Sequence, residues 1–142
     1  MQKKTVRFLL NLAQLIAMSA AVYTWDRNLT VHAISGALFA FLAVRHLQFN
    51  RRWFAFIGNF FREGAKNSRL KWQFYISLLS SIFWSLAILT GFLSLLAISS
   101  AVSTEQAAFV HIHGVLARLG CLIVLVHLVQ HRKQINAYLK KK

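Results

Sequence analysis

Four long apolar segments constrain the fold of this chain more than any other feature. They cover roughly residues 8–24, 30–49, 73–99 and 107–130 of the 142 residues. A helix needs about 20 apolar residues to cross about 30 Å of hydrocarbon, so each segment is near or above the length of a membrane span. The chain contains no proline, and 57% of its residues are hydrophobic, a composition typical of membrane proteins. We expect an all-α integral membrane four-helix bundle that forms a single transmembrane domain over residues 1–142.

Basic residues are unevenly distributed among the connections between these segments. The formal net charge of +14 would by itself be typical of a nucleic-acid-binding protein. However, fourteen Lys and Arg residues precede the first segment, follow the fourth, or lie between the second and third, whereas the first short connection holds only Arg27. This asymmetry follows the positive-inside rule. It predicts that both termini are cytoplasmic, and it accounts for the charge without a nucleic-acid partner.

Two stretches beside the spans have interpretations of their own. The basic N-terminus followed by the small residues MSAA is similar to a secretory signal, but the apolar run continues to Trp25, which favours an anchor at the membrane interface. Residues 51–66 alternate aromatic and basic side chains at helical spacing. That pattern predicts an amphipathic helix lying in the cytoplasmic interface, in contact with membrane lipid.

Two pairs of histidines share one spacing. His32 and His46 lie fourteen residues apart in the second apolar segment, and His113 and His127 repeat this spacing in the fourth. Fourteen residues are close to four helical turns, so the two rings of each pair face one way, about 21 Å apart along the axis. Because the second and fourth segments cross in the same direction, His32 comes level with His113 and His46 with His127. The sequence therefore predicts an outer and an inner bis-histidine site.

Haem iron suits two level histidines better than zinc does. Zinc usually takes four protein ligands at one point, and no Cys, Asp or Glu is placed to complete either pair. A haem needs only two axial imidazoles from facing helices. Between the histidines lie Phe39 and several small residues that would leave room for porphyrin planes, namely Ser35, Gly36, Ala43, Ala117 and Gly120. The opposing interpretation is that the histidines only form hydrogen bonds between helices and that the small residues only allow close packing.

These features together resemble a known class of membrane protein. The H-x13-H pairs are similar to those of the cytochrome b subunits of respiratory bc complexes, and HAISGALFAFLAVRHLQFNRRW and SLLSSIFWSLAILTG resemble a family of small bacterial four-helix cytochrome b-like proteins. The resemblance covers nearly the whole chain. It implies two non-covalent b haems, with the four histidines as axial iron ligands, and electron transfer across a bacterial inner (plasma) membrane. It identifies neither an electron donor nor an acceptor.

Three functions are compatible with the sequence. The first is a di-haem cytochrome that passes electrons between a quinone pool and other redox subunits. The second is a self-contained oxidoreductase that reacts with quinol or superoxide, and the third is a haem-free scaffold or assembly subunit of a membrane complex. The sequence predicts no catalytic residue for any of them.

Two arginines and two further histidines lie in or near the spans. A guanidinium within a span needs an anionic partner or a route to the surface, so we expect Arg45 to meet a propionate of the inner haem and Arg118 a propionate of the outer one. Snorkelling to the cytoplasmic surface is the alternative for Arg45. We interpret His131 as a surface residue, and the sequence assigns no role to His111.

Overall fold

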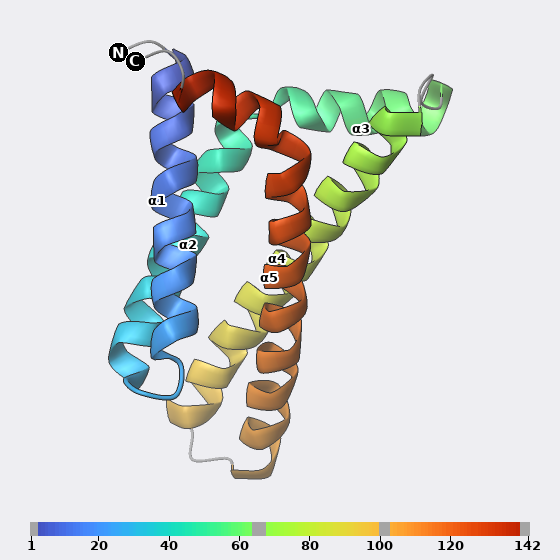
Figure 1. Cartoon of the computed structure of the whole chain (residues 1–142). Coiled ribbons are helices and arrows are strands. Elements are labelled where there is room, and N and C mark those ends of the chain that lie inside the picture. The colour runs from blue at the N-terminus through green and yellow to red at the C-terminus, as the bar shows by residue number, and fades with distance from the viewer. Residues whose placement is uncertain (1–2, 64–67, 100–102, 140–142) are drawn as a thin grey trace. The chain divides into compact units, whose positions relative to one another are not determined.

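The chain folds into helices joined by short connections. The structure, a computed structural model, describes residues 3–63, 68–99 and 103–139, and in these residues it contains no strand. The helices of the described residues are α1 (Lys3–Thr24), α2 (Leu29–Phe49), α3 (Arg52–Glu63), α4 (Ser68–Ser99) and α5 (Ser103–Leu139) (Figure 1). All but α3 are long and apolar enough to cross a membrane. The prediction of an all-α, multi-pass membrane protein is confirmed.

The helices extend somewhat beyond the predicted spans. The parts that are apolar enough to lie in hydrocarbon are Thr5–Thr24, Leu29–Phe49, Lys71–Leu96 and Ala108–Arg132. The largest difference is in α5, which continues to Leu139 although its apolar run ends near residue 130. Residues 131–139 contain neither glycine nor proline, so nothing in their backbone stops the helix when the polarity changes.

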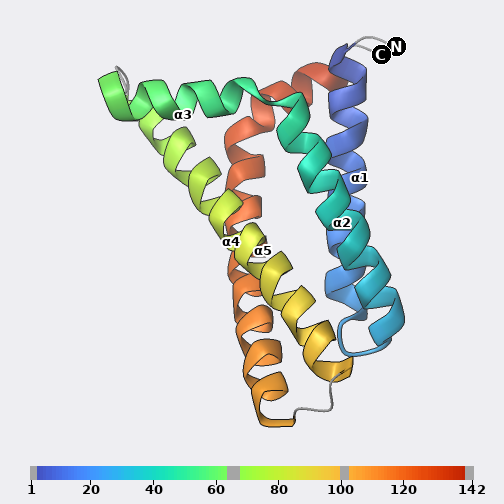
Figure 2. The ribbon, with the colours of Figure 1, turned by 180° about the vertical axis from the view of Figure 1, so that it is seen from behind.

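The helices are grouped in two compact units, Met1–Gly64 and Ala65–Lys142. In the first unit α1 and α2 lie side by side as an antiparallel hairpin (Figure 1). In the second unit α4 and α5 form another antiparallel hairpin (Figure 2). Each potential membrane span therefore packs against the span next to it in sequence, and the expectation of a single domain stays a prediction.

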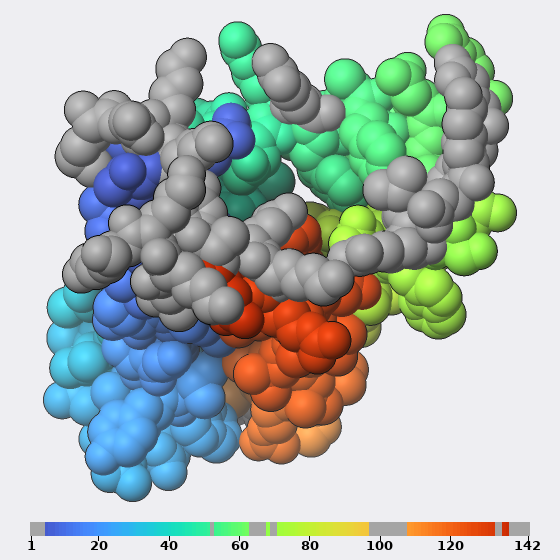
Figure 3. All heavy atoms as spheres, turned by 45° about the horizontal axis from the view of Figure 1, so that its top comes forward, coloured from blue at the N-terminus to red at the C-terminus, as the bar shows by residue number. Residues whose placement is uncertain are grey.

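The predicted interfacial segment 51–66 forms the shorter helix α3. This helix turns sideways from the end of α2 (Figure 1), and its green side chains project beside that end in the space-filling view (Figure 3). It is strongly amphipathic. Trp53 stacks on Phe56 with 5.6 Å between ring centroids, and Phe61 is 71% exposed. These properties are typical of a helix that lies in a membrane interface.

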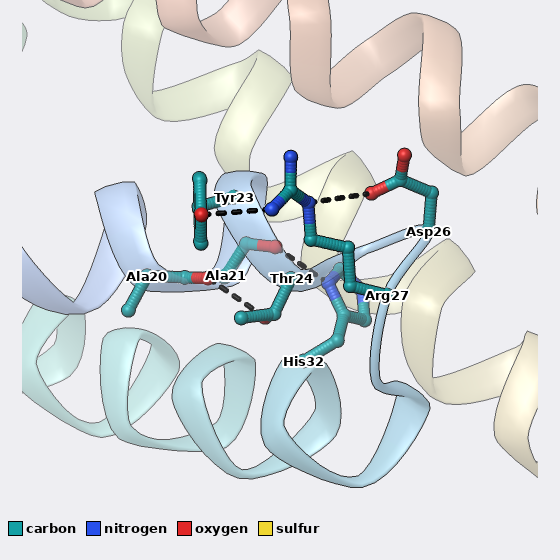
Figure 4. A network of polar contacts seen from close by, with 7 residues as sticks. All are labelled: Ala20, Ala21, Tyr23, Thr24, Asp26, Arg27 and His32. Atoms are coloured by element: carbon teal, nitrogen blue, oxygen red, sulfur yellow. Dashed lines mark hydrogen bonds and ion pairs between the residues drawn. The ribbon is translucent and has the colours of Figure 1, made fainter.

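Asparagines fix both ends of α2. At its start, the Asn28 side chain accepts a hydrogen bond of 3.0 Å from the Val31 amide, which satisfies one of the free N–H groups of the first turn. At its end, the Asn50 amide donates to the carbonyls of His46 and Leu47. The α1–α2 connection is further ordered by Arg27, whose guanidinium donates to the Tyr23 hydroxyl at 2.8 Å (Figure 4).

The spans expose most of their large apolar side chains. Ile34, Phe92 and Leu122 are 64%, 59% and 60% exposed. The buried side chains are mostly small or aromatic: Ala17, Met18 and Phe39 in the first unit, and Phe74, Ala87 and Ser94 in the second. Apolar surface on this scale is costly in water and suited to hydrocarbon, so these helices contact lipid.

Candidate haem-ligating histidines

His32 lies near the start of α2 and points toward α1. Its Nδ1 is 2.8 Å from the carbonyl oxygen of Ala21, near the end of α1 (Figure 4). A carbonyl oxygen only accepts hydrogen bonds, so Nδ1 carries the proton and donates it. In the neutral imidazole the lone pair is then on Nε2, which is the form that a metal-ligating histidine takes when its other nitrogen donates to a carbonyl.

His113 has the same arrangement in the second hairpin. Its Nδ1 lies 2.8 Å from the carbonyl oxygen of Ala87 on α4, so this ring is also held with Nδ1 as the donor. Gly91 makes room for it: a Cβ at that position would lie 2.9 Å from Cε1 and 3.1 Å from Nδ1 of His113. Carbon atoms in contact are normally about 3.5 to 4.0 Å apart. The position of the ring therefore requires a glycine at residue 91.

His46, near the end of α2, contacts side chains from both directions. Its Nδ1 lies 2.8 Å from Oδ1 of Asn11 on α1, and its Nε2 lies 3.3 Å from Nδ2 of Asn50. The Asn50 side-chain amide donates this hydrogen bond, which agrees with a lone pair on Nε2 of His46. The same Nδ2 atom also lies 2.9 Å from the His46 carbonyl oxygen. A metal at Nε2 would replace only the longer of these two contacts.

His127, in the second half of α5, has the weakest contact of the four. Its Nδ1 lies 3.5 Å from the Ser77 hydroxyl on α4, which is long for a hydrogen bond. Its ring centroid is 4.6 Å from that of His131, one turn further along α5, and the two planes are tilted by 49°. His131 is half-buried and lies against His127, and its interpretation as a surface residue stays a prediction. The two side chains are four residues apart and therefore share one face of α5.

The two hairpins repeat one pattern of contacts. In each, the second helix carries two histidines fourteen residues apart, and the first helix supplies the oxygens ten residues apart, from Asn11 and Ala21 in one case and Ser77 and Ala87 in the other. The histidine near the connection contacts an alanine carbonyl, and the distant one contacts a polar side chain. The histidine spacing predicted from the sequence is thus matched by a second regularity on the neighbouring helix.

Sequence reasoning did not identify these oxygens or Gly91. A backbone carbonyl has no side-chain signature, so the sequence carried no sign of the roles of Ala21 and Ala87. Asn11 and Ser77 did carry a signal, because each is a polar side chain inside an apolar segment. Reading polar residues of the first and third segments against the histidines of the second and fourth would have found them.

In each hairpin, aromatic rings lie midway between the two histidines. Phe39, midway along α2, is 5% exposed. Gly120, midway between His113 and His127, was expected to leave room for a porphyrin. A Cβ there would lie 3.2 Å from Cε2 of Trp84 on α4, so Gly120 also accommodates an indole from its own hairpin.

The two arginines of the spans lie away from the histidine faces. The Arg45 guanidinium donates to Oε1 of Gln48 at 2.8 Å and lies 5.5 Å from the centroid of the Phe49 ring, so it points toward the end of α2, as a snorkelling side chain does. Arg118 is exposed and, five residues after His113, lies about 140° around α5 from it. The suggested contacts with propionates stay predictions for both.

The four histidines do not form one cluster within a hairpin. His32 and His46 lie near opposite ends of α2, and His113 and His127 are also fourteen residues apart, well inside α5. The predicted pairs each combine a histidine of one unit with a histidine of the other, so the pairing stays a prediction. Among the described residues, no three His, Cys, Asp or Glu side chains gather as a metal site, whereas an axial haem site needs only two. His111 is exposed.

Comparison with known protein families, with curated proteins and with solved structures finds no match to this chain. Its function must be inferred from the residues and contacts described above.

Proposed function

We propose that this protein is a membrane b-type cytochrome with two haems, which passes electrons across the bilayer between a quinone pool and a partner redox protein. The observation that carries the proposal is the repeated contact of each histidine Nδ1 with an oxygen of the neighbouring helix. Metal-ligating histidines almost always make this kind of contact, because it fixes the tautomer, orients the ring and makes Nε2 a stronger ligand.

In this proposal each half of the membrane holds one haem. His32 and His113 would hold the outer haem, and His46 and His127 the inner one. Bound haem iron supplies the one-electron chemistry. The chain itself would supply four imidazoles and an apolar surrounding that excludes water, and both would influence the reduction potential.

The direction in which the spans cross the membrane determines the depth of each proposed haem site. If four spans cross the membrane in turn, the basic residues beside their ends place the termini in the cytoplasm of a bacterium. The connection that holds Asp26 and Arg27 then lies on the outer side, next to His32. Two redox sites at different depths give an electron a path from one face of the membrane to the other.

A haem-free scaffold is the second candidate, because the same contacts of His32, His46 and His113 join the two helices of a hairpin. Interhelical hydrogen bonds in membranes are worth about 0.6 kcal/mol each on average. In that role the histidines would add little to the stability of the fold. The scaffold hypothesis also gives no reason for the fourteen-residue spacing to occur twice. We therefore favour the cytochrome.

The test is a reduced-minus-oxidised absorbance spectrum of the full chain, purified after expression with supplied haem, together with the amount of haem per chain. The cytochrome predicts b-type bands and two haems per chain. A protein that folds and carries no haem would be a scaffold. Transfer across the bilayer is tested in proteoliposomes that enclose ferricyanide: a soluble quinol added outside should reduce it faster than in liposomes that contain the haem-free chain.

A further inference from the structure

A groove lies at the elbow where α2 turns into α3. It has a volume of about 440 Å³ and is lined by Val44, Leu47, Gln48, Arg51 and Phe54. Three of these side chains are apolar, and the other two are an amide and a guanidinium. The α2 span ends at Phe49, so Val44, Leu47 and Gln48 belong to the end of the span, and Arg51 and Phe54 lie just beyond it.

The elbow is held in shape by hydrogen bonds on both sides of the turn. The Arg7 guanidinium donates to the Phe49 carbonyl at 3.1 Å, which ties the end of α2 to α1. The Trp53 amide donates to the Asn50 carbonyl at 2.7 Å, and the Phe54 amide to the Arg51 carbonyl at 3.2 Å. These bonds satisfy backbone groups that a chain leaving a helix would otherwise expose. The elbow is thus an ordered part of the first unit, and the groove on it is shallow and open.

The groove is separate from the histidine face of α2. Three of its lining residues, Val44, Leu47 and Gln48, lie on α2 at positions i, i+3 and i+4, which form one stripe along the helix. His46 lies roughly 150° around the helix from that stripe. A ligand in the groove would therefore not compete with a haem, and a site there does not depend on the proposed electron transfer.

The charge at the groove is positive and the membrane offers a complementary partner. Arg51 lines the groove. A second guanidinium, that of Arg45, donates a hydrogen bond to the lining residue Gln48. Among the side chains that the structure describes, no carboxylate lines the groove. Guanidinium groups bind phosphate through charge-assisted hydrogen bonds, and anionic lipids attract basic segments beside a span.

We propose that this elbow is a binding site for one anionic phospholipid. The phosphate lies against Arg51 and Gln48, and the start of an acyl chain lies along Val44, Leu47 and Phe54. Phe54, 57% exposed, and the other aromatic residues of α3 sit at the depth where lipid headgroups meet acyl chains. The groove holds the headgroup and the upper part of one chain, and the rest of the lipid remains in the bilayer.

The test is native mass spectrometry of the full chain released from nanodiscs that contain equal amounts of phosphatidylglycerol and phosphatidylcholine. The wild-type chain should retain one phosphatidylglycerol. Arg51→Gln should reduce the retained fraction by about tenfold, the effect expected for the loss of a charge-assisted hydrogen bond. Leu47→Trp should do the same while keeping the charge, because the indole fills the groove.

Two further variants make the result specific. Arg62→Gln removes the same charge from α3 at an exposed position that does not line the groove, and it should retain lipid as the wild type does. Arg51→Lys should retain more lipid than Arg51→Gln. Equal losses in Arg62→Gln and Arg51→Gln would overturn the proposal in favour of diffuse surface charge. Equal retention of phosphatidylcholine, or a bound quinone in place of the lipid, would overturn it as well.

Discussion

Replacing Gly91 by alanine is the sharpest available test of how the second hairpin orients His113. The added Cβ would lie 2.9 Å from Cε1 and 3.1 Å from Nδ1 of the imidazole. The ring must move or α4 and α5 must separate, and a move of the ring breaks the 2.8 Å bond from Nδ1 to the Ala87 carbonyl. Overpacking costs about 1–3 kcal/mol and the lost hydrogen bond about 1 kcal/mol.

The lower end of the combined cost, about 2 kcal/mol, corresponds to a roughly thirtyfold weaker hold on the proposed outer haem. This lies within the 10–100-fold losses found when the groups that orient a metal ligand are removed. The assay is haem per chain and the reduced-minus-oxidised spectrum, measured on detergent-purified protein after repeated washing. Gly91→Ala should lose most of one haem and keep the other.

Gly114→Ala is the matched control for this experiment. Gly114 follows His113 directly on α5, and a Cβ there would meet no atom within 4 Å. The control makes the same chemical change in the same membrane half and should keep both haems. If Gly91→Ala also keeps both haems with an unchanged spectrum, the reasoning that the Nδ1 contact holds His113 for iron is refuted.

Three further predictions follow from the contacts and burial of the two hairpins. Asn11→Leu removes the oxygen 2.8 Å from Nδ1 of His46 and should weaken retention of the inner haem by about 10–100-fold, as measured by haem per chain; unchanged retention would show that this contact does not orient a ligand. Ser77→Ala removes a contact of 3.5 Å, so its effect in the same assay should be less than about fivefold, and a loss as large as that of Asn11→Leu would contradict the ranking by distance. Phe74→Ala should lower the free energy of unfolding by about 3 kcal/mol, because Phe74 is 1% exposed. The control is Phe92→Ala, since Phe92 is 59% exposed. In increasing amounts of denaturing detergent, the unfolding midpoint should shift clearly for Phe74→Ala and little for Phe92→Ala.

The helical class and the spans could be predicted from the sequence because hydrocarbon imposes a length and a composition on any segment that crosses it. The interfacial helix α3 could be predicted for a similar reason, since its aromatic and basic residues alternate with the helical period. The end of α5 could not, because hydropathy reports where the membrane ends and not where the helix ends. Leu139 lies well beyond the apolar run.

The candidate site, like the fold, could be predicted from the sequence only in part. The histidine spacing was visible because it follows from one helix and its period. The partners of Nδ1 depend on how two helices pack, and two of them are backbone carbonyls that no residue type identifies. Gly91 and Gly120 appear in the sequence as similar small residues, yet one accommodates an imidazole and the other the Trp84 indole. Only the packed hairpin distinguishes these roles.

In the proposed cytochrome, one histidine from each hairpin holds each haem. Haem counted in two double variants of the full chain tests this pairing. His32→Ala with His113→Ala removes both ligands of one predicted site and should leave one haem with an unperturbed bis-histidine spectrum. His32→Ala with His127→Ala damages both sites and should leave none of that spectrum. If the first variant keeps no haem while the second keeps one, or if both lose haem equally, the histidines are not paired in this way.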